Sequence, residues 1–174
     1  MAKSVSIIGY GWLGKPLAHV LKQDGHTIIG SCRSSDKKEA LTDDGLDTMT
    51  LNLQAPPFQS IPSPLVTVDT VIITVPFKRG LENPWHYTEQ IKHIANACVS
   101  HGVSHVIMSS STSVYPSTNE ITTESSDTDS TDRAKALSAA EQHLLSHDDF
   151  DATILRFGGL FGPNRMPSRF FRHK

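Results

Sequence analysis

The stretch Val5-Ser6-Ile7-Ile8-Gly9-Tyr10-Gly11-Trp12-Leu13-Gly14-Lys15-Pro16-Leu17 decides the fold of this chain. A short apolar strand runs into three glycines spaced G-x-G-x-x-G, and apolar residues at helical spacing follow. The first glycine permits a tight turn, the second lets a diphosphate approach the backbone, and the third lets the helix pack closely on the strand. The amides and positive dipole end of that helix would face the phosphates. The stretch therefore predicts dinucleotide binding by the loop residues Gly9, Tyr10, Gly11, Trp12, Leu13 and Gly14.

These glycines allow two other interpretations. Glycines between a strand and a helix can serve backbone geometry alone. A second strand, 26–32, follows the helix at once, however, so the glycines belong to a strand–helix–strand unit. The stretch also resembles the phosphate loop of nucleoside triphosphatases, but that loop needs a hydroxyl after Lys15 to hold Mg²⁺, and Pro16 has none. Dinucleotide binding remains the favoured interpretation.

The composition is that of an ordinary globular domain. The chain has 174 residues, 37% of them hydrophobic, and a net charge of −2. Without a basic cluster or a long apolar run, neither nucleic acid nor a membrane is an expected partner. Two cysteines make no disulfide framework, and no signal peptide precedes the first strand, so we expect a cytoplasmic protein.

Apolar strands alternate with helical segments along the whole chain. We predict strands at 5–8, 27–32, 48–53, 70–75, 105–109 and 152–157, and helices at 12–24, 36–43, 84–101 and 131–147. This alternation predicts an α/β fold: a Rossmann-type, doubly wound parallel sheet in a three-layer αβα arrangement, forming one domain, 1–174. The acidic stretch 117–132 is predicted to be a mobile loop.

The end of the second strand bears on the choice of cofactor. NAD binders commonly place an acidic residue there to hold the ribose hydroxyls. Here Arg33 and Ser34 follow the strand, and an arginine with hydroxyls suits a 2′-phosphate. The sequence therefore predicts a preference for NADP, and Asp36 keeps NAD as the alternative.

Further cofactor contacts are expected beyond the carboxyl ends of the third and fourth strands, where ligands of this fold class lie. After the third strand we expect residues that flank the adenine, and after the fourth residues that line the cofactor near its nicotinamide ribose. They are Asn52, Leu53, Thr74, Val75 and Pro76. Lys78 and Arg79 come next, either as phosphate ligands or as a solvated loop edge.

Two more motifs follow the fifth and sixth strands: M-S-S-S-T-S-V-Y-P at 108–116 and L-R-F-G-G-L-F-G-P at 155–163. With the N-terminal glycines they resemble the extended short-chain dehydrogenase/reductase family, the epimerase/dehydratase relatives of sugar-nucleotide enzymes. The resemblance implies NAD(P) binding and oxidoreductase or epimerase activity on an unidentified small molecule, either a nucleotide sugar or a carbonyl compound. It implies that Ser111 bonds the substrate oxygen. It also implies a homodimer and a C-terminal substrate-binding portion after Pro163, for which residues 164–174 would be too short.

The chain departs from this family at the Y-x-x-x-K motif, whose tyrosine and lysine transfer the proton. Counted back from Glu141, the tyrosine position holds Arg133 and the lysine position holds Leu137. In this the chain is similar to the YeeZ-like subgroup, which shares the fold and lacks the usual pair. Arg133 stays charged at any ordinary pH, so it is no acid or base, although it can hold an anion. Tyr115 is the remaining candidate phenol, with packing at the strand end as its alternative role.

Two hypotheses on function follow. The first is an NADP-dependent oxidoreductase or epimerase in which Ser111 contacts the substrate. The second is a non-catalytic NADP-binding sensor that kept the phosphate-binding loop and lost the chemistry. No metal site is predicted, because His143 and His147, four residues apart, lack an apparent third ligand.

Overall fold

The computed structural model describes residues 2–54, 56–78, 80, 82–118 and 120–169. Within them, six strands form one parallel sheet in the order β3-β2-β1-β4-β5-β6. The strands are β1 (Ser4–Ile8), β2 (Thr27–Cys32), β3 (Asp47–Thr50), β4 (Thr70–Ile73), β5 (His105–Ser111) and β6 (Asp151–Phe157). The α-helices are α1 (Gly14–Gln23), α2 (Ser35–Asp43), α3 (Trp85–His101) and α4 (Asp132–Leu145). The predicted Rossmann-type fold is confirmed.

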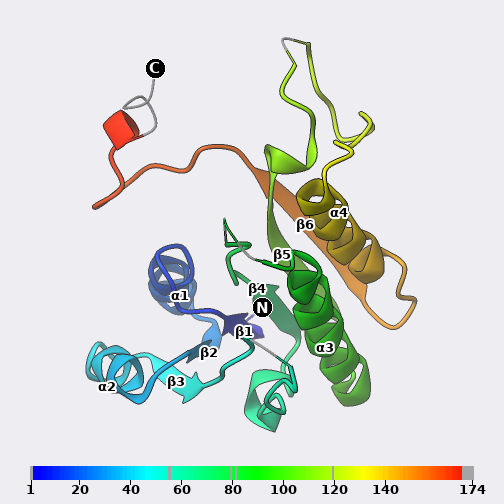
Figure 1. The fold of residues 1–174 in the computed structure, drawn as a ribbon. Helices are drawn as coiled ribbons and strands as arrows, with labels where there is room; N and C mark the ends of the chain where they lie inside the picture. Colours follow the sequence, from blue (N-terminus) through cyan, green and yellow to red (C-terminus); the bar gives the residue numbers. More distant parts are fainter. Residues whose placement is uncertain (1, 55, 79, 81, 119, 170–174) are drawn as a thin grey trace.

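Helices cover the sheet from both sides (Figure 1). Helices α1 and α2 pack on the face of β1 and β2 through a small core that contains Ile7, Ala18 and Leu41. A larger core on the other face includes Ile91 of α3 and Leu137 of α4. The central strands are mostly apolar because a parallel sheet covered on both faces removes both sets of side chains from water.

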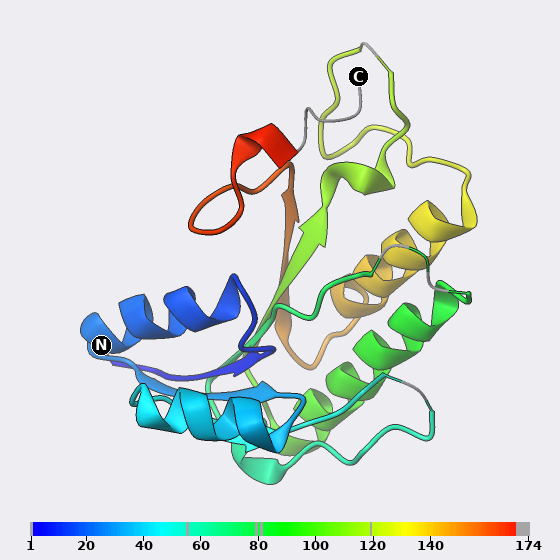
Figure 2. The ribbon, with the colours of Figure 1, turned by 60° about the vertical axis from the view of Figure 1, so that its left-hand side comes forward.

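The strand order reverses at β1, and this positions the site. β1 pairs with β2 on one side and with β4 on the other, so Ile8 lies between Ser31 and Ile73. The connections from β1 and β4 leave in opposite directions and open a crevice at the carboxyl ends of the strands. β5 and β6 continue past the end of β4, pairing Ser109–Ser111 with Leu155–Phe157 (Figure 2). This extension forms a wall beside the crevice.

Element boundaries differ from the prediction at four places that matter for the site. Strand β4 ends at Ile73 and not at Val75, and strand β5 continues to Ser111 instead of ending at Ser109. Helix α1 begins at Gly14, two residues later than expected, which leaves Trp12 and Leu13 in the turn. Strand β3 ends at Thr50 and not at Leu53. The Leu51 amide still donates to the Cys32 carbonyl at 2.8 Å, but Leu51 and Leu53 then bury themselves in the larger core and leave the ladder.

The acidic stretch before α4 carries no helix or strand among its described residues. It ends where Thr131 Oγ1 accepts a hydrogen bond from the Ala134 amide at 3.3 Å, which caps α4. The mobility of 117–132 stays a prediction. Among the helices in the described ranges, none has the length and apolar character needed to cross a bilayer.

Candidate functional site

The turn from β1 into α1 has the geometry that the glycine spacing predicts. Gly9 has a φ of 111°, which L-residues rarely adopt. Its carbonyl accepts a hydrogen bond from Thr74 Oγ1 at 2.6 Å, which ties the turn to the end of β4. A Cβ on Gly14 would lie 2.4 Å from that same carbonyl oxygen and 2.8 Å from Thr74 Oγ1. Gly9 and Gly14 are therefore required by the protein's own packing.

Gly11 differs from both neighbours because the space beside it is open. A Cβ on Gly11 would meet Gly9 O at 3.8 Å and no nearer described atom. No side chain caps the N-terminus of α1, whose cap residue is Leu13. At the start of α1 the Lys15 amide donates to the Gly11 carbonyl at 3.1 Å and Pro16 has no N–H, so among the described hydrogen bonds the Gly14 amide is the one left for a ligand. An open glycine before this amide fits a diphosphate.

Tyr10 has a structural role in the folded chain. Its side chain is only 1% exposed, and three of its ring atoms would lie within 2.7 Å of a Cβ on Gly30. The ring therefore packs directly on β2, and burial raises the pKa of its phenol. Its hydroxyl has no hydrogen-bond partner among the described residues.

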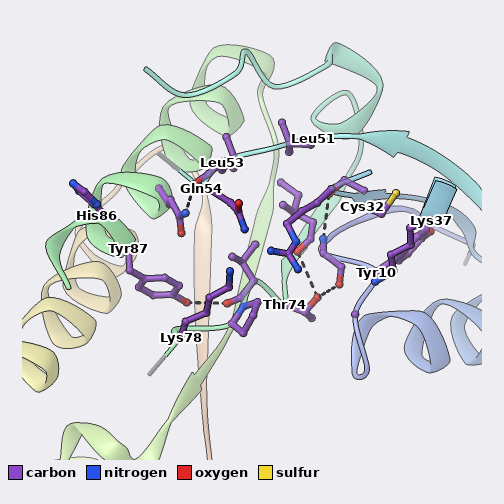
Figure 3. A pocket seen from close by; sticks show the side chains of 18 residues that line it. Tyr10, Cys32, Lys37, Leu51, Leu53, Gln54, Thr74, Lys78, His86 and Tyr87 are labelled. Carbon is purple, nitrogen blue, oxygen red and sulfur yellow. Dashed lines mark hydrogen bonds between the residues drawn. The ribbon is translucent and has the colours of Figure 1, made fainter. Parts of the chain in front are cut away.

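A first hollow, of about 190 Å³, opens beyond β1, β2 and β4 (Figure 3). Apolar side chains of Leu51 and Leu53 contribute to its wall, and the Gln90 side chain donates to the Leu53 carbonyl. Its polar rim consists of side chains from four separate segments. They are Arg33, Lys37, Gln54, Lys78, His86 and Gln90.

Positive charge gathers at this rim. With its side-chain oxygen turned toward them, Gln54 accepts hydrogen bonds from Arg33 Nη1 and, at 3.1 Å, from Lys78 Nζ. Lys37 also lines the first hollow, and none of its described lining residues is a carboxylate. Ser34 and Asn52 lie outside this lining, the former as the cap of α2 and the latter accepting from the Gln54 amide at 3.1 Å. Arg79 lies outside the described residues.

A second hollow, of about 410 Å³, adjoins the first and shares Gly11, Thr74–Pro76 and Tyr87 with it. Tyr87 donates from its hydroxyl to the Val75 carbonyl at 3.2 Å, and burial raises the pKa of this phenol. The rest of the lining comes from Trp12 and Leu13, from Phe77 after β4, from the ends of β5 and β6 and the segments that follow them, and from the first turns of α4. The two hollows together follow the crevice where the strand order reverses.

Ser111 lies in the second hollow, as a substrate contact requires. Its Oγ accepts a hydrogen bond from the Ser113 amide at 3.1 Å. The neighbouring hydroxyls are used differently, because Ser109 donates to the Ile73 carbonyl at 3.1 Å and Ser110 donates to Glu141.

Tyr115 lies outside both hollows. Its hydroxyl accepts from Arg156, which also forms a 2.6 Å ion pair with Glu141. Glu141 is fully buried, and bonds from Ser110 and Arg156 satisfy its carboxylate. The phenol is thus part of a packed polar network behind the wall formed by β5, which matches the alternative role given to it above.

The structure brings both substituted motif positions to the second hollow. Arg133 and Leu137 line it, whereas Lys135 points to solvent on the same helix. Arg133 donates to the carbonyls of Phe77 at 2.9 Å and Lys78 at 2.8 Å, and its guanidinium lies 4.0 Å above the Phe77 ring. The described lining has no histidine, lysine, aspartate or glutamate, so it offers binding groups and no acid or base that titrates near neutrality.

Trp12 joins the glycine turn to the segment after β6. Its Nε1 donates to the Pro163 carbonyl at 2.8 Å, and the Arg165 guanidinium lies 5.1 Å from its ring centre. Gly162 packs closely on this ring, because a Cβ there would lie 3.0 Å from the indole and the ring would have to shift slightly. Trp12 therefore holds this segment across the start of α1, where Leu160 and Arg165 reach the second hollow.

Sequence reasoning missed several residues of the two hollows. Phe157, Gly158 and Leu160 follow a strand directly, so the rule about carboxyl ends already pointed to them. Lys37, His86 and Gln90 come from helices, and nothing in their local sequence marks them. In all the described ranges, the two hollows included, no group of three or more histidine, cysteine, aspartate or glutamate side chains is arranged to hold a metal ion.

The sequence matches a known family of nucleotide-binding proteins, as this geometry leads one to expect. The NAD(P)H-binding family matches residues 9–169. Protein YeeZ of Escherichia coli (strain K12) is 32% identical over 177 residues, which cover 99% of this chain and 64% of YeeZ. The chain thus spans less than two thirds of the length of that relative.

Solved structures show the same fold. A Methylobacillus flagellatus protein, named for the NAD-dependent epimerases/dehydratases, superposes with a TM-score of 0.74 at 27% identity, covering 95% of this chain and 57% of its own. MoeE5 in complex with UDP-glucose and NAD superposes with a TM-score of 0.75 at 22% identity, covering 96% and 58%. With its open glycine turn, its paired hollows and its substituted proton-transfer positions, the chain belongs to the NAD(P)H-binding family as an atypical extended short-chain dehydrogenase/reductase.

Proposed function

We propose that this chain is the NADP-binding portion of an oxidoreductase or epimerase, with NADP favoured over NAD. The observation that carries the preference is the charge of the first hollow. Arg33, Lys37 and Lys78 line it, and no described lining residue opposes them with a carboxylate. A 2′-phosphate adds negative charge and several acceptor oxygens to the adenosine ribose, so it gains from such a rim while NAD does not.

The remaining contacts of the dinucleotide follow from the two hollows. The open space at Gly11 and the uncapped start of α1 would hold the diphosphate. Leu51 and Leu53 would bound the adenine, and Val75 and Pro76 the nicotinamide side. When bound, the nicotinamide supplies hydride transfer, which no side chain can provide. Ser111 would bond the substrate oxygen from the wall of the second hollow.

Calorimetric titration with NADP and NAD tests the preference. Arg33→Gln is expected to weaken NADP binding by about tenfold or more while leaving NAD binding within about twofold, since it removes one charge-assisted hydrogen bond. Lys38→Gln is the matched control, because Lys38 is an exposed lysine of α2 outside the lining of the first hollow. Tighter binding of NAD than of NADP by the unchanged chain would contradict the proposal.

A second candidate is a sensor that binds NADP without turning over a substrate. It is favoured by Arg133 and Leu137, which line the second hollow where the family carries its tyrosine and lysine. NADPH oxidation across a panel of nucleotide sugars and carbonyl compounds separates the two. Turnover that Ser111→Ala abolishes, with NADP affinity intact, supports the enzyme. Silence across the panel together with micromolar NADP binding supports the sensor.

A further inference from the structure

We propose that the second hollow takes a substrate bearing an anionic group, a carboxylate or a phosphate, and that Arg133 and Ser111 bind this group. The inference deepens the proposed function, because the same hollow would receive the nicotinamide end of the cofactor. It assigns a role to the position at which the chain departs from its family.

The positive charge of the second hollow is the first observation that supports an anionic substrate. Two of its lining residues are arginines, Arg133 and Arg165, and none of its described lining residues is acidic. Phe77, Leu137 and Phe157 contribute apolar wall, which lowers the local dielectric constant and strengthens attraction to an anion. The buried carboxylate of Glu141, on the same helix as Arg133, is paired with Arg156.

The fixed position of the Arg133 guanidinium is the second observation that supports anion binding. Bonds to the carbonyls of Phe77 and Lys78, together with the Phe77 ring beneath it, hold the group in place. A guanidinium carries its N–H donors in a planar fork that matches carboxylate and phosphate oxygens. Because the side chain is already ordered, binding an anion costs little of its conformational entropy.

Ser111 supplies a second donor in the lining of the same hollow. Its Oγ accepts from the Ser113 amide, and its proton has no acceptor among the described residues. The protons of Ser109 and Ser110 are committed to the Ile73 carbonyl and to Glu141. Of these three consecutive serines, Ser111 is thus the one able to donate to an oxyanion in the hollow.

Calorimetric titration of the NADP-saturated chain with inorganic phosphate and with malonate provides the test, and the two probes distinguish phosphate from carboxylate recognition. Saturation with NADP keeps the probes out of the cofactor's own phosphate sites. Arg133→Gln is expected to weaken binding of the preferred probe by about tenfold or more, and Ser111→Ala by a smaller factor. Lys135→Gln removes the same charge from the exposed side of α4 and should change nothing.

Equal affinity of Arg133→Gln and Lys135→Gln for both probes, or no binding of either probe to the unchanged chain, would overturn the inference. Thermal melting and NADP affinity of each variant show whether Arg133→Gln disturbs the loop at Phe77 and Lys78. If it does, Arg133→Lys, which keeps the charge and loses the planar fork, should bind the probe with intermediate affinity. If the unchanged chain does not bind NADP, that result counts against the proposed function alone. The affinities of Arg133→Gln and Lys135→Gln for phosphate and malonate, measured on the cofactor-free chain, would then decide whether the anion site exists.

Discussion

Gly11→Ala, which adds a single methyl group, should weaken cofactor binding without weakening the fold. In the folded chain the new Cβ has Gly9 O as its nearest described neighbour, at 3.8 Å, which is ordinary van der Waals contact. Gly11 is not among the glycines with positive φ, so alanine fits its backbone. Fewer unfolded conformations should then raise the free energy of unfolding by about 0.4–1 kcal/mol.

The same methyl group stands where the diphosphate would approach the turn. Forcing an extra methyl into a packed contact costs about 1–3 kcal/mol, which corresponds to about 5–150-fold in affinity. We expect NADP binding to weaken by that factor in calorimetric titration, while urea unfolding followed by circular dichroism shows equal or greater stability.

Gly14→Ala is the matched comparison. Its Cβ would lie 2.4 Å from a backbone oxygen of the turn, so backbone atoms must shift, and the free energy of unfolding should fall by about 1–3 kcal/mol or more. The reasoning about the open turn is refuted if Gly11→Ala binds NADP as tightly as the unchanged chain, or if it unfolds as easily as Gly14→Ala.

Three further outcomes follow from packing and protonation. Glu141→Gln leaves Arg156 without its buried partner and should lower the free energy of unfolding by about 3 kcal/mol in urea titration; adding Arg156→Met should recover part of the loss, and no recovery would contradict the pairing. Gly30→Ala pushes a Cβ into the buried Tyr10 ring and should cost about 1–3 kcal/mol, so unchanged thermal melting would argue against that contact. Burial is the main cause, and the nearby His147 the next, that lowers the pKa of His143 below its usual 6.5. The folded state therefore binds fewer protons than the unfolded state near that pH. The stability that this gives above pH 6.5 is lost as the pH falls below that value. His143→Gln should reduce the slope of unfolding free energy against pH in that window, and an unchanged slope would assign it to other groups.

Local sequence was enough to predict the strands and helices and the glycine turn of the site. The alternation of strands and helices reports burial on both faces of a parallel sheet, and Gly9-x-Gly11-x-x-Gly14 requires a turn that few other residues permit. These signals depend on residues close together in the chain, so they survive without any tertiary information. The substituted positions Arg133 and Leu137 were found in the same way, by counting along one helix.

Tertiary structure alone decided what each loop residue does. Tyr10 and Trp12 share the glycine loop, yet the ring of one is buried on Gly30 and the other holds the segment at Pro163. Tyr115 is the remaining candidate phenol in the sequence, but Arg156 of β6 holds it in a network outside the hollows. Lys37 and Lys78 line the same hollow although 41 positions separate them. A sequence pattern reports which residues must be buried or turned, but the partner that a side chain finds depends on segments that only folding brings together.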